Sequence, residues 1–180
     1  MRTRSAIVGD ARHVAALVAN YSGDGTLLPR TYAEVCENIR DFVVVEEEGK
    51  IIGCGALHIY GPHLAEVRSI AVTPRAQRRG AGRRVVRWLL KEARRQRITR
   101  VCLFTRIPEY FARLGFSLAQ REQIPDKLYR DCLACPRLEC CDEIAMVREE
   151  VLAEDAVAES ARVAAGQARS QAAPLVQIAK

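Results

Sequence analysis

The chain has 180 residues, a net charge of +6 and a hydrophobic content of 49%. This length and composition favour one globular domain with a sizeable core. No apolar run reaches membrane-spanning length and the N-terminus lacks a secretory signal, so we expect a cytoplasmic protein with no membrane partner. Only 6% of the residues are aromatic, so stacking platforms are scarce and we expect no nucleic-acid partner.

Apolar or β-branched runs predict three strands in the first half of the chain: Ser5–Val8, Phe42–Glu46 and Ile51–Ile59. Two helices separate the first of these strands from the second. Asp10 is placed to cap the first helix, and Thr31 with Glu34 forms a T-x-x-E capping box for the other. The turn Glu48-Gly49-Lys50 then joins the last two strands as a hairpin.

The second half is organised around a strand at Ala65–Val72 and a helix that ends near Arg95. Apolar residues recur along one face of this helix: Val85, Val86, Leu89, Leu90 and Ala93. Basic residues occupy the other face. Further along the chain, Thr99–Thr105 is typical of a core strand, Glu109–Leu114 of a short helix and Ile144–Val147 of a final strand.

Between that strand and helix lies the loop Gln77-Arg78-Arg79-Gly80-Ala81-Gly82. Its two glycines let the backbone turn tightly and approach a ligand closely. Unpaired N–H groups at a helix N-terminus, together with the helix dipole, favour a phosphate or pyrophosphate. The arginines add charge that suits the same anion. A basic patch of this kind also fits nucleic acid, but a polyanionic cofactor explains it equally well.

The sequence Q-R-R-G-A-G after Ala-Val-Thr-Pro resembles the Q/R-x-x-G-x-G/A acetyl-CoA loop of the GNAT acetyltransferases. It lacks the Gly-Lys-Ser/Thr of a P-loop and has too few glycines for a dinucleotide fingerprint. The resemblance implies an α/β GNAT fold, with helices on both faces of a mixed sheet and acetyl-CoA wedged where the central strands part. It assigns cofactor binding to these residues: Ile70, Ala71, Val72, Gln77, Arg78, Arg79, Gly80, Ala81 and Gly82. We expect this domain to cover residues 1–149, and residues 150–180 to form an Ala-rich tail that is partly disordered or weakly helical.

Longer stretches narrow the resemblance. LLPR-T, LFTRIPEYFARLGF and the ending CPR…CDE-x-A-M-V resemble the short, single-domain form of the N-acetylglutamate synthase branch of this family. That branch implies transfer of acetyl from acetyl-CoA to the α-amino group of L-glutamate, the first step of arginine biosynthesis. Other acceptors stay open: another amino acid, a polyamine or a protein N-terminus. A non-catalytic, CoA-binding regulatory domain is the alternative of a different class, and a homodimer is also considered.

Acetyl transfer to an amine requires a base that removes a proton from the ammonium group. The resemblance places Glu66 near that amine, as the base acting directly or through water. The alternative is a structural carboxylate paired with Arg68. The backbone N–H of Ile70 or Val72 is the implied donor to the thioester carbonyl. Thr105 is a lesser candidate, for a hydroxyl close to the amine or thiol.

Many family members carry a tyrosine four residues before a Gly-Phe pair, as the acid for the leaving thiolate. Here Phe111 stands at that position, as it also tends to in the glutamate branch. Tyr110 is one residue away, and one helical step turns a side chain by about 100°. We therefore do not expect Tyr110 to serve as the acid.

Glutamate carries two carboxylates, so its site needs at least two cations, preferably arginines with bidentate geometry. The candidates are Arg30, Arg68, Arg106 and Lys127. Arg30 matches the arginine that the resemblance assigns to substrate, and Arg137 lies in the segment that closes over substrate in this branch. A solvated surface group is the alternative for each of them. Such cations would repel a polyamine.

The sequence contains seven cysteines, and without a secretory signal we expect reduced thiols. Four of them cluster as Cys132, Cys135, Cys140 and Cys141. A structural zinc site at this cluster is conceivable but not favoured, because one short loop would supply every ligand. The adjacent Cys140 and Cys141 would also point apart in an extended segment. A redox-sensitive pair and plain buried thiols are the other interpretations.

Overall fold

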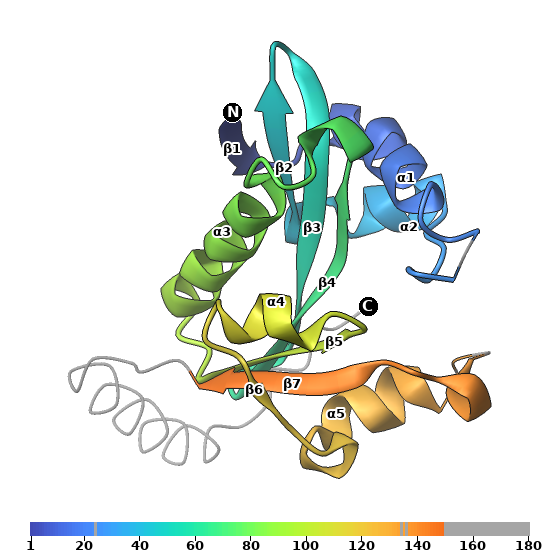
Figure 1. Ribbon diagram of the computed structural model, residues 1–180, viewed down its shortest axis with the longest axis vertical. Helices are drawn as coiled ribbons and strands as arrows, with labels where there is room; N and C mark the ends of the chain where they lie inside the picture. The colour runs from blue at the N-terminus through green and yellow to red at the C-terminus, as the bar shows by residue number, and fades with distance from the viewer. Residues whose placement is uncertain (24, 134, 136, 150–180) are drawn as a thin grey trace, which may run out of the picture. The chain divides into compact units, whose positions relative to one another are not determined.

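The computed structural model describes residues 1–23, 25–133, 135 and 137–149. Within them the chain forms a seven-stranded mixed sheet in the order β1-β2-β3-β4-β5-β7-β6 (Figure 1). The strands are β1 (Arg2–Ser5), β2 (Phe42–Glu47), β3 (Lys50–Gly61), β4 (Leu64–Val72), β5 (Arg100–Thr105), β6 (Ser117–Leu118) and β7 (Ile144–Glu149). Neighbouring strands are antiparallel except β4 and β5, which are parallel. The tail predicted at residues 150–180 lies outside the described residues.

Helices cover both faces of the sheet, as predicted. The α-helices are α1 (Ala11–Ala19), α2 (Tyr32–Glu37), α3 (Ala81–Arg95), α4 (Pro108–Ala112) and α5 (Pro125–Lys127). α1 and α2 pack on one face of the sheet, and α3 packs on the opposite face (Figure 1). Short 3₁₀ turns lie at Val8–Asp10, Ile39–Asp41, Pro74–Ala76, Arg121–Gln123 and Leu138–Cys140, and a π-helical turn lies at Leu128–Cys132. In the described part of the chain, no helix is long and apolar enough to cross a membrane.

The amphipathic pattern of α3 is confirmed by its packing. All five apolar residues predicted to share one face of this helix are buried in the core cluster that it forms with the sheet. Gly55 of β3 faces the helix, and a Cβ atom added there would lie 2.5 Å from Cγ1 of Val85. The missing side chain therefore lets α3 approach the sheet closely.

The first strand is not where the hydrophobic pattern predicts it. β1 spans Arg2–Ser5, whereas Ile7 and Val8 of the predicted strand are 62% and 60% exposed and lead into a 3₁₀ turn. β1 is an edge strand that pairs with β2 through its backbone, and its Arg4 Nε donates to Glu46 at 3.0 Å. A polar edge strand carries no alternating apolar signal, which explains the error.

Asp10 occupies the predicted N-cap position of α1, but its side chain makes no capping hydrogen bond to this helix. Its carboxylate accepts a hydrogen bond from the Ile7 N–H at 2.8 Å and pairs with Arg4 at 2.6 Å. Asp10 therefore closes the 3₁₀ turn that precedes α1, and makes no side-chain cap of α1 itself. The capping box of α2 is confirmed, because the Glu34 N–H donates to Thr31 Oγ1 at 3.2 Å and the Thr31 N–H donates to Glu34 at 2.7 Å.

The central strands β4 and β5 pair over a short distance and then part. Their register pairs are Ala65 with Val101 and Glu66 with Cys102. Beyond them β4 carries a β-bulge, because Ser69 and Ile70 oppose a single residue of β3. Ser69 has a φ of 53°, in the left-handed region. A bulge bends its strand, so β4 diverges from β5 and leaves a gap between the two strands.

The close approach of α3 to the sheet makes a prediction about stability. Gly55→Ala should lower the free energy of unfolding by about 1–3 kcal/mol, because the new methyl group overpacks against Val85. Gly9→Ala is the matched control, since a Cβ atom there meets no heavy atom within 4 Å. Urea denaturation of both variants measures the difference, and equal unfolding midpoints would contradict the close packing.

Candidate active site

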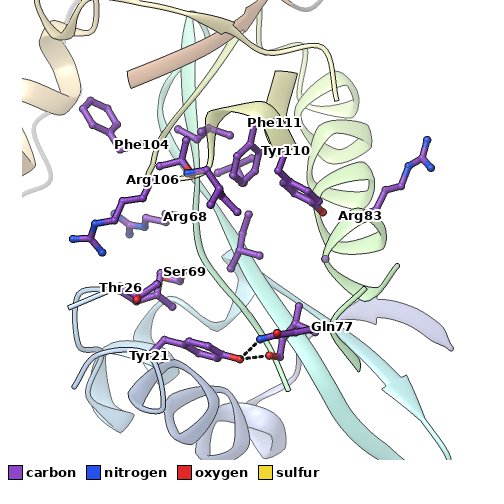
Figure 2. Close-up of a pocket in the computed structure, with 18 of the residues that line it drawn as sticks. Tyr21, Thr26, Arg68, Ser69, Gln77, Arg83, Phe104, Arg106, Tyr110 and Phe111 are labelled. Atoms are coloured by element: carbon purple, nitrogen blue, oxygen red, sulfur yellow. Dashed lines mark hydrogen bonds between the residues drawn. The ribbon is translucent and has the colours of Figure 1, made fainter. Parts of the chain in front are cut away.

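A cavity of about 760 Å³ opens where β4 and β5 part (Figure 2). Its walls come from the end of α1 and the loop after it, from β4, from the loop before α3, and from β5 and α4. The lining residues are Tyr21, Thr26, Leu27, Val67, Arg68, Ser69, Ile70, Val72, Gln77, Arg78, Gly80, Gly82, Arg83, Leu103, Phe104, Thr105, Arg106, Ile107, Tyr110, Phe111, Arg113 and Glu143. The volume is in the range of small-molecule sites.

The loop before α3 has the backbone geometry of an anion cradle. Arg78 has a φ of 58° and Gly80, the residue that begins α3, has a φ of 89°. Left-handed residues interspersed in a turn direct successive N–H groups towards one side, where an anion can bind. The loop also joins the N-terminus of a 15-residue helix, whose dipole favours negative charge there. The loop therefore fits the pyrophosphate of acetyl-CoA.

Tyr21 fixes this loop to the end of β4. Its hydroxyl donates to the carbonyl of Val72 and accepts a hydrogen bond from Gln77 Nε2 at 3.0 Å (Figure 2). The sequence pattern indicated Tyr21 only as part of the first helix. The contact joins residues 51 and 56 positions apart in the chain, so no local signal marks it.

Six of the nine residues predicted to bind the cofactor line the cavity: Ile70, Val72, Gln77, Arg78, Gly80 and Gly82. The other three do not. Ala71 packs into the core beneath α1 and α2, and Ala81, the first residue of α3, is buried in the core between this helix and the sheet. Arg79 donates to both carboxylate oxygens of Glu47, at 3.0 and 2.9 Å. This pair holds the loop against the end of β2.

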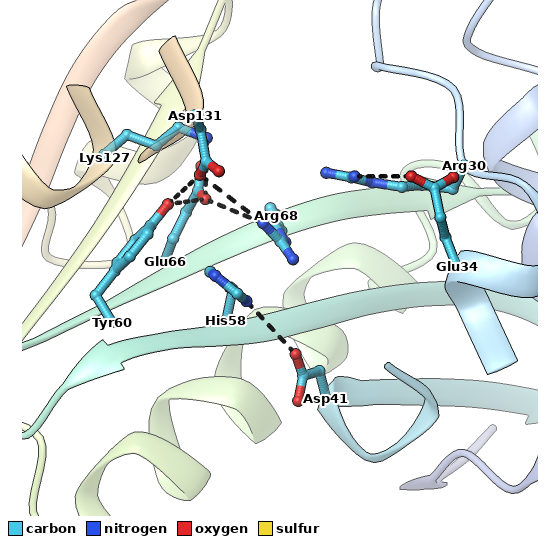
Figure 3. A network of polar contacts seen from close by, with 9 residues as sticks. All are labelled: Arg30, Glu34, Asp41, His58, Tyr60, Glu66, Arg68, Lys127 and Asp131. Atoms are coloured by element: carbon cyan, nitrogen blue, oxygen red, sulfur yellow. Dashed lines mark hydrogen bonds and ion pairs between the residues drawn. The ribbon is translucent and has the colours of Figure 1, made fainter. Parts of the chain in front are cut away.

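Glu66 lies in a buried polar network outside the cavity lining (Figure 3). Its side chain is 4% exposed, and its Oε1 lies 2.9 Å from Nζ of Lys127. Its Oε2 lies 3.0 Å from the hydroxyl of Tyr60. Both oxygens are thus engaged in this structure, and the role of Glu66 as base stays a prediction.

Tyr60 and Asp131 complete the network, and neither was identified by the sequence analysis. The Tyr60 hydroxyl lies between the carboxylates of Glu66 and Asp131, and Lys127 Nζ lies 3.2 Å from Asp131. Burial, followed by the charge of Glu66, raises the pKa of Tyr60. Burial disfavours the charged forms of Lys127 and Asp131. Hydrogen bonds and ion pairs within the network favour those charged forms more strongly, so the pKa of Lys127 is raised and the pKa of Asp131 is lowered. Lys127 and Asp131 are therefore both charged, and their contacts with Tyr60 and Glu66 hold the segment 125–132 against β3 and β4.

Arg68 connects this network to the cavity. Its Nη1 lies 3.9 Å from a carboxylate oxygen of Glu66 and 3.9 Å from one of Asp131, and its side chain also lines the cavity. The predicted alternative for Glu66, a pair with Arg68, is thus present, although Lys127 is the closer partner.

Arg106 lines the cavity from the end of β5. It donates to Asp142 at 2.7 Å and to the carbonyl of Gly25 at 2.8 Å. Figure 2 shows the side chains of Arg106 and Arg68 directed to the same side of the cavity. Arg30 and Lys127 lie outside the lining, and Arg30 pairs loosely with Glu34 at 3.9 Å (Figure 3).

Two hydroxyl groups reach the cavity. Thr105 is 7% exposed, and its Oγ1 accepts a hydrogen bond from the Ile107 N–H at 3.0 Å, which leaves its own hydrogen to be donated. Tyr110 lines the cavity together with Phe111. Its hydroxyl would lie 3.1 Å from a Cβ atom at Gly82, so it stands at the phosphate end of the cavity.

The cysteine cluster does not favour zinc. Among the described residues, no three His, Cys, Asp or Glu side chains are grouped as metal ligands. All four are free thiols: Cys140 is exposed, and Cys132, Cys135 and Cys141 are half-buried, so none of them is a fully buried thiol. Arg121 lies 3.1 Å from Sγ of Cys141.

Comparison with known proteins identifies the class. The family model described as the Acetyltransferase (GNAT) family matches residues 17–116. An uncharacterized N-acetyltransferase of Chlorobaculum tepidum is 36% identical over 145 residues, 81% of this chain and 94% of that protein. An amino-acid acetyltransferase of Mycobacterium tuberculosis is 37% identical over 117 residues, 63% of this chain and 67% of that protein.

A solved structure shows the same architecture. The N-acetylglutamate synthase of Neisseria gonorrhoeae, complexed with coenzyme A and N-acetyl-glutamate, has a TM-score of 0.71 and 29% identity. The match covers 82% of this chain and 34% of the synthase, so this chain spans about a third of that enzyme. The fold and the cavity define an acetyl-CoA-dependent N-acetyltransferase. The chain belongs to the GNAT acetyltransferase family.

The anion cradle makes a prediction about cofactor binding. Gly80→Ala should raise the KM for acetyl-CoA roughly tenfold, because a side chain resists the left-handed backbone that orients the loop N–H groups. Gly49→Ala is the matched control, since Gly49 also has a positive φ (73°) and open space around it, in the turn between β2 and β3. Steady-state kinetics compare the two. A KM that changes equally in both variants would mean that the loop geometry has no special role.

Proposed function

We propose that this protein transfers the acetyl group of acetyl-CoA to the α-amino group of L-glutamate, the first step of arginine biosynthesis. One observation carries the proposal. Arg68 of β4 and Arg106 at the end of β5 line the same cavity from opposite sides of the gap. Two guanidinium groups directed into one site match the two carboxylates of glutamate.

The charge of the cavity supports an anionic acceptor. Its described lining includes the arginines Arg68, Arg78, Arg83, Arg106 and Arg113, and a single carboxylate, that of Glu143. A polyamine would meet net repulsion in such a site. An amino-acid acceptor is also supported by relatives named amino-acid acetyltransferase, and glutamate by the Neisseria gonorrhoeae complex with N-acetyl-glutamate.

In this proposal, one part of the cavity binds acetyl-CoA and the other holds the reacting groups. The loop Gln77–Gly82 binds the pyrophosphate, and the backbone N–H of Ile70 or Val72 donates to the thioester carbonyl as negative charge develops on it. Thr105 supplies a hydroxyl donor close to the reacting groups. These assignments follow from the cavity lining and from the resemblance.

Glu66, Lys127 and Arg30 lie outside the cavity lining and support the site indirectly. Glu66 holds Lys127 in place and steadies Arg68, so in this proposal it is a positioning residue. Lys127 secures the segment 125–132. Through Asp131 and Arg68 this segment adjoins the acceptor end of the cavity, by which we mean the part lined by Arg68, Thr105 and Arg106. Arg30 belongs to the turn that enters α2 and extends towards Arg68 (Figure 3), where it adds positive charge for a substrate carboxylate.

The acceptor is tested by CoA release from acetyl-CoA with a panel of amines: L-glutamate, other free amino acids, spermidine and a peptide N-terminus. We expect turnover selective for L-glutamate. Turnover confined to spermidine or the peptide would refute the proposed acceptor while keeping the acetyltransferase. No turnover with any amine, in a protein that still binds acetyl-CoA, would favour a regulatory CoA-binding domain.

Arg68 makes a separate prediction about the substrate carboxylates. Arg68→Gln should raise the KM for glutamate by roughly ten- to a hundredfold, the loss expected for a charge-assisted hydrogen bond. The KM for acetyl-CoA should change little. Arg87→Gln, an exposed position on α3 outside this cavity, is the matched control and should leave both constants unchanged. An equal rise in both constants for Arg68→Gln would argue against a carboxylate-binding role.

A further inference from the structure

Glu143 is the one acidic side chain in the described lining of the cavity. It directly precedes β7, whose first residue, Ile144, pairs with Thr105 of β5. This register places Glu143 beside the residue that follows β5, Arg106, whose charge acts on its carboxylate. Arg121 donates to the main-chain carbonyl of Glu143 at 2.7 Å and so fixes its backbone. The carboxylate therefore stands at the end of the cavity that we assign to the acceptor.

The carboxylate of Glu143 differs from its acidic neighbours in having no partner. Within the described residues it makes no hydrogen bond or ion pair, whereas Asp142 binds Arg106 at 2.7 Å and Glu66 binds Lys127 at 2.9 Å. The charged groups around Glu143 have opposing effects: Arg106 and Lys127 favour its charged form, whereas Glu66 and Asp142 disfavour it. Burial is the largest influence and raises the pKa of Glu143. A partly buried, unpaired carboxylate with raised proton affinity has the properties of a general base.

We propose that Glu143 is the general base that deprotonates the acceptor amine. The carboxylate takes one proton from the ammonium group, and the neutral nitrogen attacks the thioester carbonyl carbon. The C–S bond then breaks, the nitrogen loses its second proton, and the leaving CoA thiolate takes one up. Amide and free CoA result, with one proton released overall. The inference rests on the proposed amine acetylation but holds for any ammonium acceptor, glutamate or not.

Geometry separates Glu143 from Glu66, the base that the resemblance implied. Glu66 is 3% exposed, holds an ion pair with Lys127 and lies outside the cavity lining. To accept a proton it would have to release a buried ammonium group and leave that charge unpaired, which is costly. Glu143 requires no such exchange, because it lines the cavity and its carboxylate has no partner among the described residues.

The test is the pH profile of kcat/KM for the wild type and for Glu143→Gln, with the best acceptor from the amine panel. A base works only when deprotonated, so wild-type activity should fall as the pH drops through the raised pKa of Glu143. Glu143→Gln should lower kcat by roughly 10²–10⁴ and abolish this acidic limb. Glu143→Asp should keep the limb at a reduced kcat. The titration of the acceptor amine itself is common to all variants, so the difference between profiles isolates the side chain.

Two further variants complete the test. Glu139→Gln makes the same chemical change on an exposed residue four positions away and should match the wild type. Glu66→Gln should retain the acidic limb. Thermal melting and acetyl-CoA binding confirm that each variant is folded. A folded Glu143→Gln that keeps the limb would overturn the inference, as would one that changes only the KM for the acceptor, since Glu143 would then merely anchor the ammonium group. Because wild-type turnover is measured first, failure of this test is distinct from failure of the glutamate proposal.

Discussion

The site depends on one irregularity of the sheet, the parting of β4 and β5 after a brief parallel pairing. Two register pairs hold the strands together, and the bulge at Ser69 and Ile70 then bends β4 away. In a regular sheet the facing edges of these strands would be consumed by hydrogen bonds to each other. Here the edges border a cavity instead. The binding site therefore originates in backbone geometry, before any side chain contributes.

Charge is distributed unequally around this gap. Arginines dominate the cavity lining, whereas the carboxylates of Glu66 and Asp131 are gathered with Lys127 in the adjoining network. Because these carboxylates are neutralised by Lys127 outside the cavity, they do not offset the arginines, and the cavity lining keeps its positive charge. The same contacts hold the segment 125–132 against β3 and β4. Burying ion pairs of this kind has an unfavourable desolvation free energy. In return, the ion pairs keep the cations of the acceptor end in fixed positions.

Features encoded by adjacent residues could be predicted from the sequence. The loop Gln77–Gly82, the buried stripe of α3 and the capping box of α2 are local patterns, and the structure confirms their conformation or packing. The misplaced first strand shows the limit of such patterns, because β1 is held by its partner strand and by Arg4 rather than by apolar alternation.

The acceptor end was harder to predict because its contacts join distant parts of the chain. Tyr60 and Asp131 are 71 positions apart, and nothing in either stretch indicates the other. Glu66 lies on the strand where the resemblance placed it, yet its ion pair with Lys127 depends on how the segment 125–132 folds back. Glu143 belongs to the CDE-x-A-M-V ending that carried the resemblance, but that ending assigned it no role in the site. Its place in the cavity follows only from the register of β7 against β5.

The carbonyl of Gly25 accepts hydrogen bonds from both Arg106 and Arg137, at 2.8 and 3.2 Å. It thus joins three stretches of chain that are far apart in the sequence: the loop after α1, the residue that follows β5 and the segment before β7. A change in any one of these stretches would therefore disturb the position of Arg106, whereas the loop Gln77–Gly82 is formed by adjacent residues.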